Sequence, residues 1–290
     1  MGASCEAETI VATFDSHPLD VVVIRPKRGL APLDLRLLWQ FRDLLWAFAD
    51  RDIRLRYRQT ALGVAWVVLQ PLLGASVFAV VFGIIAKIPS HGVPYFLVTY
   101  SGLLGWTLLF GSISRMSMSL VANSNLIRRV FFPRLLVPLG VIPSVLLDFG
   151  VSLSVMLILM VVYRVPPTWG LLVAPVCILT ILCLAVGVGL VAASLAVRFR
   201  DIQHIVPFGM QLLMYASPVG YAAAVVPAKY RDAFLLLNPA AAPIDMLRWS
   251  FVGGEPHFKY LAYAFLVSLV AMLIGLFTFR SVEREFADVI

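Results

Sequence analysis

The chain has 290 residues, of which 61% are hydrophobic and 13% charged, and its mean hydropathy is +0.92. Soluble domains carry about 25% charged and roughly 45–50% apolar residues, so no water-soluble packing can hide this much apolar surface. The composition predicts an integral membrane protein and excludes a disordered tail, a nucleic-acid module and a secreted disulfide scaffold as the main interpretation. The three cysteines form no CxxC pair, and the first residues lack the basic-then-apolar pattern of a cleaved signal peptide.

An amphipathic segment precedes the first long apolar run. Leu37, Phe41, Leu44 and Phe48 recur at three- and four-residue spacing, which places them on one face of a helix. Polar and charged residues occupy the opposite face, so we expect this helix to lie along the inner membrane surface instead of crossing it. The predicted organisation is a cytoplasmic tail over residues 1–32, an interface helix over 33–60 and a membrane domain over 61–285.

Six apolar runs are long enough for the roughly 20 residues that a helix needs to cross a bilayer core. They lack the alternation of membrane β-barrel strands and exceed the length of such strands. The sequence therefore predicts an all-α integral membrane protein with six transmembrane helices, over about residues 63–86, 94–114, 136–162, 170–197, 205–226 and 260–279.

The distribution of basic residues predicts the orientation in the membrane. Seventeen of the 23 Lys and Arg residues fall on the side of the N-terminus and six on the other side. Because cytoplasmic loops carry an excess of Lys and Arg, both termini are expected in the cytoplasm. This asymmetry accounts for the net charge of +7 without a nucleic-acid partner.

Prolines interrupt the apolar residues 216–254, between the fifth and sixth predicted spans, and leave pieces too short to cross a membrane. Non-helical backbone at membrane depth persists only where protein or a water-filled cavity surrounds it. We therefore expect two short re-entrant helices that dip in from the outer side. A loop lying flat on the outer surface is the alternative.

No catalytic, cofactor-binding or metal-binding constellation is visible in the sequence. The four histidines are scattered, and there is no HExxH, no GxSxG and no phosphate-binding GxxxxGK[ST]. Any ATP-driven activity therefore requires an ATPase on another chain. The one acid deep in a predicted span is Asp148, for which a hydrogen bond to a neighbouring helix is favoured over a proton relay, since no second acid, His or Lys lies at similar depth.

The loop between the second and third predicted spans is short and basic. Asn123 and Ser124 can cap a helix of one or two turns that carries Arg128 and Arg129. Such a cationic knob suits a groove on a soluble partner, whereas anchoring by the positive-inside rule is the simpler explanation for the two arginines. The candidate partner-contacting residues are Asn123, Ser124, Leu126, Arg128, Arg129 and Phe131.

Four motifs, in order along the chain, resemble the ABC-2 family of transporter permeases, and more narrowly the polysaccharide and polyol-phosphate exporters of the Wzm and TagG type. The resemblance covers roughly residues 35–285. Three of the motifs are residues 123–133, residues 198–202, and Ser217-Pro218 followed by Asn238-Pro239 and Arg248. The first and longest contains Arg51, Asp52, Arg54, Arg58, Gln59, Gly63, Trp66 and Pro71.

The resemblance implies a homodimer in the bacterial cytoplasmic membrane that binds two copies of a separate ATP-binding subunit, which carries ATP and Mg. The pair would move a lipid-linked polysaccharide, such as an O-antigen, through a channel between the two permeases, in contact with membrane lipids. By the same resemblance, the interface helix corresponds to Leu33–Phe48, the coupling helix to Ser119–Phe131 and the external gate helices to Pro218–Ser250.

Aromatic rings stack on the apolar C–H faces of sugars, which gives a glycan channel a chemical basis, although most rings in a membrane protein serve packing or the interfacial belt. The channel and gate candidates are Phe78, Phe82, Tyr95, Phe96, Tyr100, Trp106, Phe110, Tyr215 and Tyr221, together with Asn238, Pro239 and Arg248.

Two alternatives are weighed against polysaccharide export. One is an ABC-2 permease for a smaller lipid or drug. The other is a membrane-embedded glycosyl- or phosphotransferase, which needs clustered acids or a metal site. The outer loop offers only Asp232, Asp245 and Glu255, without such spacing.

Overall fold

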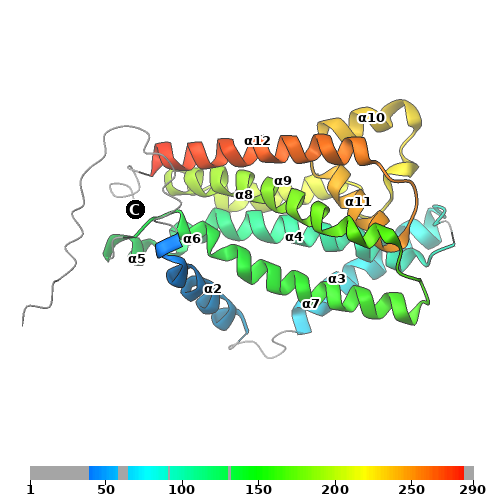
Figure 1. Ribbon diagram of the computed structural model, residues 1–290, viewed down its shortest axis with the longest axis horizontal. Helices are drawn as coiled ribbons and strands as arrows, with labels where there is room; N and C mark the ends of the chain where they lie inside the picture. The colour runs from blue at the N-terminus through cyan, green and yellow to red at the C-terminus, as the bar shows by residue number, and fades with distance from the viewer. Residues whose placement is uncertain (1–38, 58–64, 91, 130–131, 284–290) are drawn as a thin grey trace, which may run out of the picture. The chain divides into compact units, whose positions relative to one another are not determined.

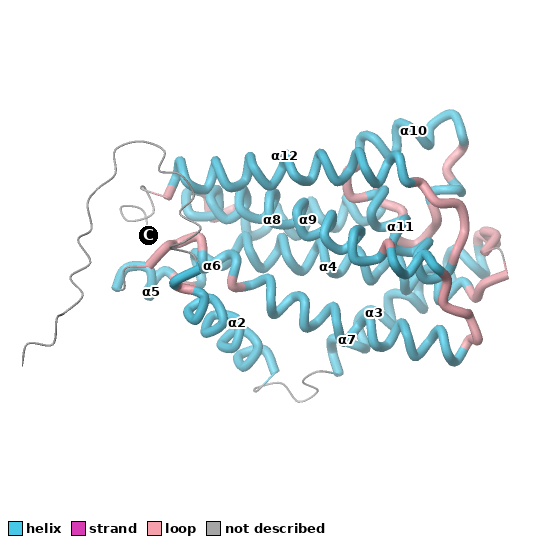
Figure 2. Tube along the Cα trace, in the orientation of Figure 1, coloured by secondary structure: helices cyan, strands magenta, loops and turns pink. Residues whose placement is uncertain are grey.

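A computed structural model describes residues 39–57, 65–90, 92–129 and 132–283, and these residues form helices joined by short loops (Figures 1 and 2). The predicted tail over residues 1–32 and the candidates Leu37, Arg58, Gln59, Gly63 and Phe131 lie outside the described residues. The helices are α2 (Arg42–Tyr57), α3 (Ala65–Phe78), the π-helical η1 (Ala79–Ile85), α4 (Tyr95–Ala122), α5 (Ser124–Arg129), α6 (Leu136–Leu139), α7 (Val141–Val162), the 3₁₀-helical η2 (Trp169–Leu172), α8 (Ala174–Arg198), α9 (Ile202–Tyr215), the 3₁₀-helical η3 (Ala223–Val225), α10 (Ala228–Leu237), α11 (Ala241–Val252) and α12 (Phe258–Val282).

Within the described residues, five helical segments are long and apolar enough to cross a membrane. They correspond to the first four and the sixth predicted spans. The second runs eight residues beyond its predicted end at residue 114, because the charge at Arg115 is paired inside the protein and does not end the helix. The five segments are Ala65–Ile85, Tyr95–Ala122, Leu136–Val162, Ala174–Arg198 and Phe258–Val282.

The fifth predicted span, residues 205–226, is not one continuous helix. It begins as α9, which has 14 residues. A helix of this length covers about 21 Å, less than a bilayer core of about 30 Å. The chain then turns at Ser217-Pro218 and continues through η3 into α10 and α11.

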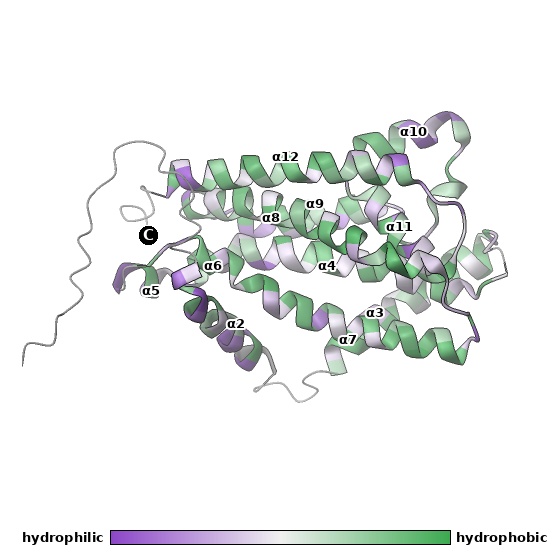
Figure 3. Cartoon of the chain, viewed as in Figure 1, coloured by the Kyte–Doolittle hydropathy of each residue, from purple (hydrophilic) through white to green (hydrophobic). Residues whose placement is uncertain are grey.

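Most of the candidate functional side chains lie at the two ends of the helical bundle. The first, here called the α5 end, is where α2, α5 and α6 lie, and the second, the α10 end, is where α10 and α11 lie (Figure 1). Hydrophilic residues concentrate on α2, α5 and α10, while α7, α8 and α12 are hydrophobic along most of their length (Figure 3). This distribution suits a bundle whose middle faces lipid and whose ends face water.

Small residues allow α8 and α12 to pack with their backbones in close contact. A Cβ atom added at Gly187 would collide with the backbone of Ala271, and one at Gly275 would collide with the carbonyl oxygen of Gly187. Close approach through small residues is the usual way for helices to associate in membranes, where lipid tails remove the hydrophobic driving force. This close contact holds α12 against α8.

The predicted amphipathic segment forms α2, which packs on α6 and α7. Phe48 is buried and its ring lies 5.7 Å from that of Phe132, while Phe41 and Leu44 are half-buried. The opposite face is exposed and includes an ion pair between Arg54 and Asp50. The helix thus presents an apolar side to the bundle, and its outward side carries charged residues together with the exposed Trp46.

Candidate functional site

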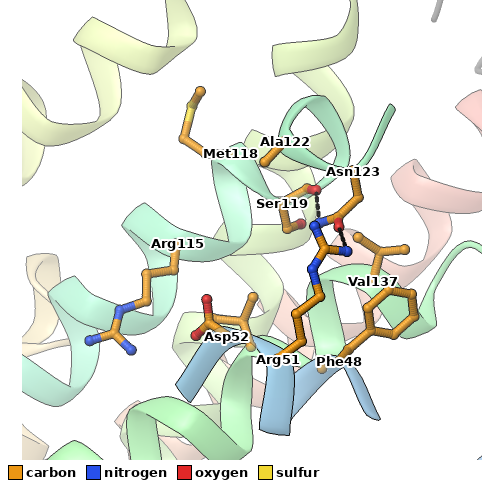
Figure 4. A pocket seen from close by; sticks show the side chains of 11 residues that line it. Phe48, Arg51, Asp52, Arg115, Met118, Ser119, Ala122, Asn123 and Val137 are labelled. Carbon is orange, nitrogen blue, oxygen red and sulfur yellow. Dashed lines mark hydrogen bonds between the residues drawn. The ribbon is translucent and has the colours of Figure 1, made fainter. Parts of the chain in front are cut away.

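A cavity of about 290 Å³ lies at the α5 end, between α2, α4 and the start of α7 (Figure 4). Its charged lining residues are Arg51 and Asp52 of α2 and Arg115 of α4. The remaining lining residues are Phe48, Met118, Ser119, Ala122, Asn123, Val137, Gly140 and Val141. The first family-like motif therefore contributes charged side chains to a cavity and not only to the helix surface.

Polar contacts connect α2, α4 and α7 beside this cavity. Ser144 of α7 donates its hydroxyl hydrogen to the Asp52 carboxylate, and the Arg115 guanidinium donates to Ser144 Oγ over 3.3 Å. The same guanidinium forms an ion pair with Asp148. These side chains are partly withdrawn from water, where a charge is tolerated only with a partner.

The structure thus places Asp148 in a contact between neighbouring helices. Sequence reasoning missed its partner because Arg115 was assigned to the loop after the second span. The presence of one basic and one acidic residue in two adjacent apolar helices is the signal from which this ion pair could have been predicted.

A second set of hydrogen bonds ties α2 to the start of α5. Arg51 donates to the Asn123 side-chain oxygen over 3.1 Å, and the Asn123 side-chain amide donates to the Ser119 carbonyl over 2.8 Å (Figure 4). The Asn123 side chain therefore does not cap α5 as predicted, since it is held by α4 and α2. Its backbone carbonyl instead accepts hydrogen bonds from Leu126 and Ile127.

Helix α5 has one apolar anchor and an exposed basic pair. Ile127 is buried and Leu126 and Ser124 are half-buried, while Arg128 and Arg129 are exposed. The two guanidinium groups are consequently accessible to a partner from outside the bundle. Of the remaining motif residues, Pro71 is buried within α3 and Trp66 is 51% exposed.

The channel and gate candidates differ in burial and in position. Tyr100 and Trp106 are buried inside the chain, and the Tyr100 hydroxyl donates to the Ser152 carbonyl, so both are packing residues and not channel surface. Five of the others form a second group at the α10 end, while Phe78, Phe82, Tyr95, Phe96 and Phe110 are half-buried on α3, η1 and α4. This second group comprises Tyr215, which is 61% exposed, the half-buried Tyr221, Asn238 and Pro239, and the buried Arg248.

Charged groups at the α10 end connect neighbouring elements of the fold. Among the described residues, no group of three or more His, Cys, Asp or Glu side chains could hold a metal ion. Asp245 instead accepts hydrogen bonds from the Ala223 backbone N–H and from Arg248. Asp232 accepts one from the hydroxyl group of Tyr260. Asp232 thus joins α10 to α12, and Asp245 joins α11 to η3.

Comparison with known proteins places this arrangement in a family context. The family model described as "ABC-2 type transporter" matches residues 43–252. An O-antigen export system permease protein RfbA of Myxococcus xanthus is 30% identical over 88% of this chain and 98% of the relative. A protein of the same name from Klebsiella pneumoniae is 27% identical over 86% and 95%, and the polysialic acid transport protein KpsM of Escherichia coli is 26% identical over 81% and 91%.

Proposed function

This chain belongs to the ABC-2 type transporter family, and we propose that it is the permease subunit of an ABC exporter that moves a lipid-linked polysaccharide across the bacterial cytoplasmic membrane. The observation that carries the proposal is its similarity to O-antigen export permeases over nearly the full length of both chains. Polysialic acid transport proteins match over a comparable length. ATP-driven movement of such a polysaccharide by the reconstituted complex tests this function.

In this proposal the α5 end receives the ATP-binding subunit, which carries ATP and Mg. The exposed Arg128 and Arg129 provide the charged contact, and the buried Ile127 fixes α5 to the bundle. Arg51 and Asn123 connect this contact to α2, and Asp52 connects α2 to the membrane helices through Ser144. A displacement of the ATPase can thus pass to α4 and α7 through hydrogen bonds.

The functional unit in this proposal is a homodimer with two ATPase subunits and a channel between the two permeases. The helices expose large apolar side chains, including Val77 and Ile84 in the first membrane segment, that require lipid or a second chain to cover them. At the α10 end, α11 is buried against α4, α8 and α12, which suits a re-entrant helix. Together, α9 and the residues that follow it complete a sixth crossing.

This topology predicts which residues a membrane-impermeant thiol reagent reaches in intact cells. Cysteines introduced at Gly92 or Glu255 are expected to react from outside, because both positions are exposed and lie on the side with few basic residues. A cysteine at Ser124 is expected to react only after the membrane is opened. Reaction at Ser124 in intact cells would overturn the assigned orientation, and reaction after opening is the control for its accessibility.

A further inference from the structure

The connection between α9 and α10, residues 216–227, has backbone groups that side chains from elsewhere in the fold satisfy. Asn238 donates to the Ala216 carbonyl over 3.0 Å, and Arg231 donates to the Ala224 carbonyl over 2.8 Å. Asp245 accepts from the backbone N–H of Ala223 over 2.9 Å. Irregular backbone away from water needs such partners, since each unsatisfied group costs free energy.

Arg248 makes the largest share of these contacts. Its side chain is 3% exposed, and its guanidinium donates to the carbonyls of Val219 and Tyr221, each over 2.8 Å, and to that of Pro218. It also donates to the Val98 carbonyl of α4 over 3.1 Å and pairs with Asp245 over 2.8 Å. One buried cation therefore joins the connection to both α4 and α11.

Two glycines permit the close approach that these hydrogen bonds require. A Cβ atom added at Gly102 of α4 would collide with the Val219 carbonyl and with the Arg248 guanidinium. One added at Gly220 would lie 2.7 Å from the Phe82 ring, and the Gly220 carbonyl accepts a hydrogen bond from the Tyr95 hydroxyl over 3.0 Å. The connection is therefore in direct contact with both α4 and η1.

A row of aromatic rings continues from the connection along η1, the seven-residue π-helix at the end of the first membrane segment. The Phe78 and Phe82 ring centroids are 5.8 Å apart, those of Phe82 and Tyr221 are 6.0 Å apart, and those of Tyr221 and Phe234 are 6.5 Å apart. π-Helical segments are rare and occur frequently at functional sites. The position of the Tyr221 ring in this row follows from the backbone that Arg248 holds.

We propose that Arg248 is a positioning residue that fixes the connection to α4 and α11, making it a rigid wall of the outer exit and not a flap. The assignment of the connection to the outer exit rests on the proposed export function, whereas its rigidity does not. The proline-broken pieces then do not shift independently of the flanking helices. Exit opening then moves the connection together with α4, through relative movement of whole helices.

The test uses Ser217→Cys as a conservative reporter in a chain whose three native cysteines are replaced by alanine. Ser217 lies within the connection and its side chain is fully buried, so a maleimide reaches the new thiol only when the connection opens. Labelling is measured in membrane fragments that expose both faces, so the result depends on neither topology nor cargo. Adding Arg248→Lys, which keeps the charge but loses the guanidinium fork, is expected to raise the labelling rate at least about tenfold, since several charge-assisted hydrogen bonds are lost.

Gly102→Ala provides a second variant that displaces the connection without changing any charge, and it is expected to raise labelling in the same way. Gly111→Ala is the matched control on α4, because a Cβ atom there lies 3.6 Å from Val145, an ordinary contact. Resting ion leak of reconstituted vesicles should rise in the first two variants and not in the control. A merely stabilising role would lower the amount of folded protein but leave labelling per folded molecule and leak unchanged.

Native labelling rates in both Arg248→Lys and Gly102→Ala would overturn the proposal, whether or not export is later demonstrated. If Arg248→Lys prevents membrane insertion, the result for Gly102→Ala decides alone. If the unmutated complex fails to export while labelling rises in the two variants, the proposed function is contradicted and the positioning role stands.

Discussion

Replacing Asp148 with leucine is expected to destabilise the folded permease by about 3 kcal/mol, the cost typical of removing one partner from a buried ion pair. The Arg115 guanidinium then loses its carboxylate while three-quarters of its side chain stays out of water. Unfolding of the purified chain in detergent, followed by helical signal against denaturant, measures the change. The amount of chain that accumulates in membranes is also compared between the Asp148→Leu variant and the unmodified protein.

A double replacement separates the lost ion pair from lost packing. Arg115→Met combined with Asp148→Leu leaves no unpaired charge in the pair, so its cost should fall well below the sum of the single costs. Asp50→Leu is the matched control, because the Asp50–Arg54 pair is exposed on both sides and is expected to contribute at most about 1 kcal/mol. Additive effects of the two single changes would contradict the assigned coupling between α4 and α7.

The second large effect is expected at α5. Replacing Arg128 and Arg129 with glutamate should reduce copurification of the ATP-binding subunit by an order of magnitude or more, because reversing charge at an interface costs several kcal/mol. Both side chains are exposed, so the folded bundle should persist. Lys229→Glu, an exposed change of the same sign on α10, is the control. Unchanged assembly together with unchanged export would remove α5 from the coupling role.

Local patterns in the sequence predict the helices well, because a span is recognised from its own residues. The apolar runs indicate five helices that the structure contains, and the three- and four-residue spacing around Phe41 and Phe48 indicates α2. The fifth predicted span is broken because Ser217-Pro218 follows α9, and the carbonyls released there find partners in distant side chains. The mean hydropathy of a stretch of sequence contains no information about those partners.

The ion pairs could not be predicted in the same way, since they depend on tertiary neighbours. Arg115 was expected at a loop boundary, yet it lies inside α4 because Asp148 is beside it in α7. Arg248 lies between the fifth and sixth predicted spans and is therefore expected in an outer loop, yet it is buried among carbonyl groups of α4 and of the connection. In both cases an arginine, a residue type that is usually exposed to water, is buried because it has a partner far away in the sequence.

ATP-dependent transport in reconstituted vesicles tests the central claim most directly. The vesicles contain this chain, its ATP-binding subunit and the lipid-linked polysaccharide of the same bacterium, with the nucleotide sites facing outward and the glycan labelled. The account predicts that the glycan becomes protected inside the vesicles with hydrolysable ATP and both subunits, and that omitting either subunit abolishes protection. An assembled complex that hydrolyses ATP while the glycan stays fully accessible outside would contradict it.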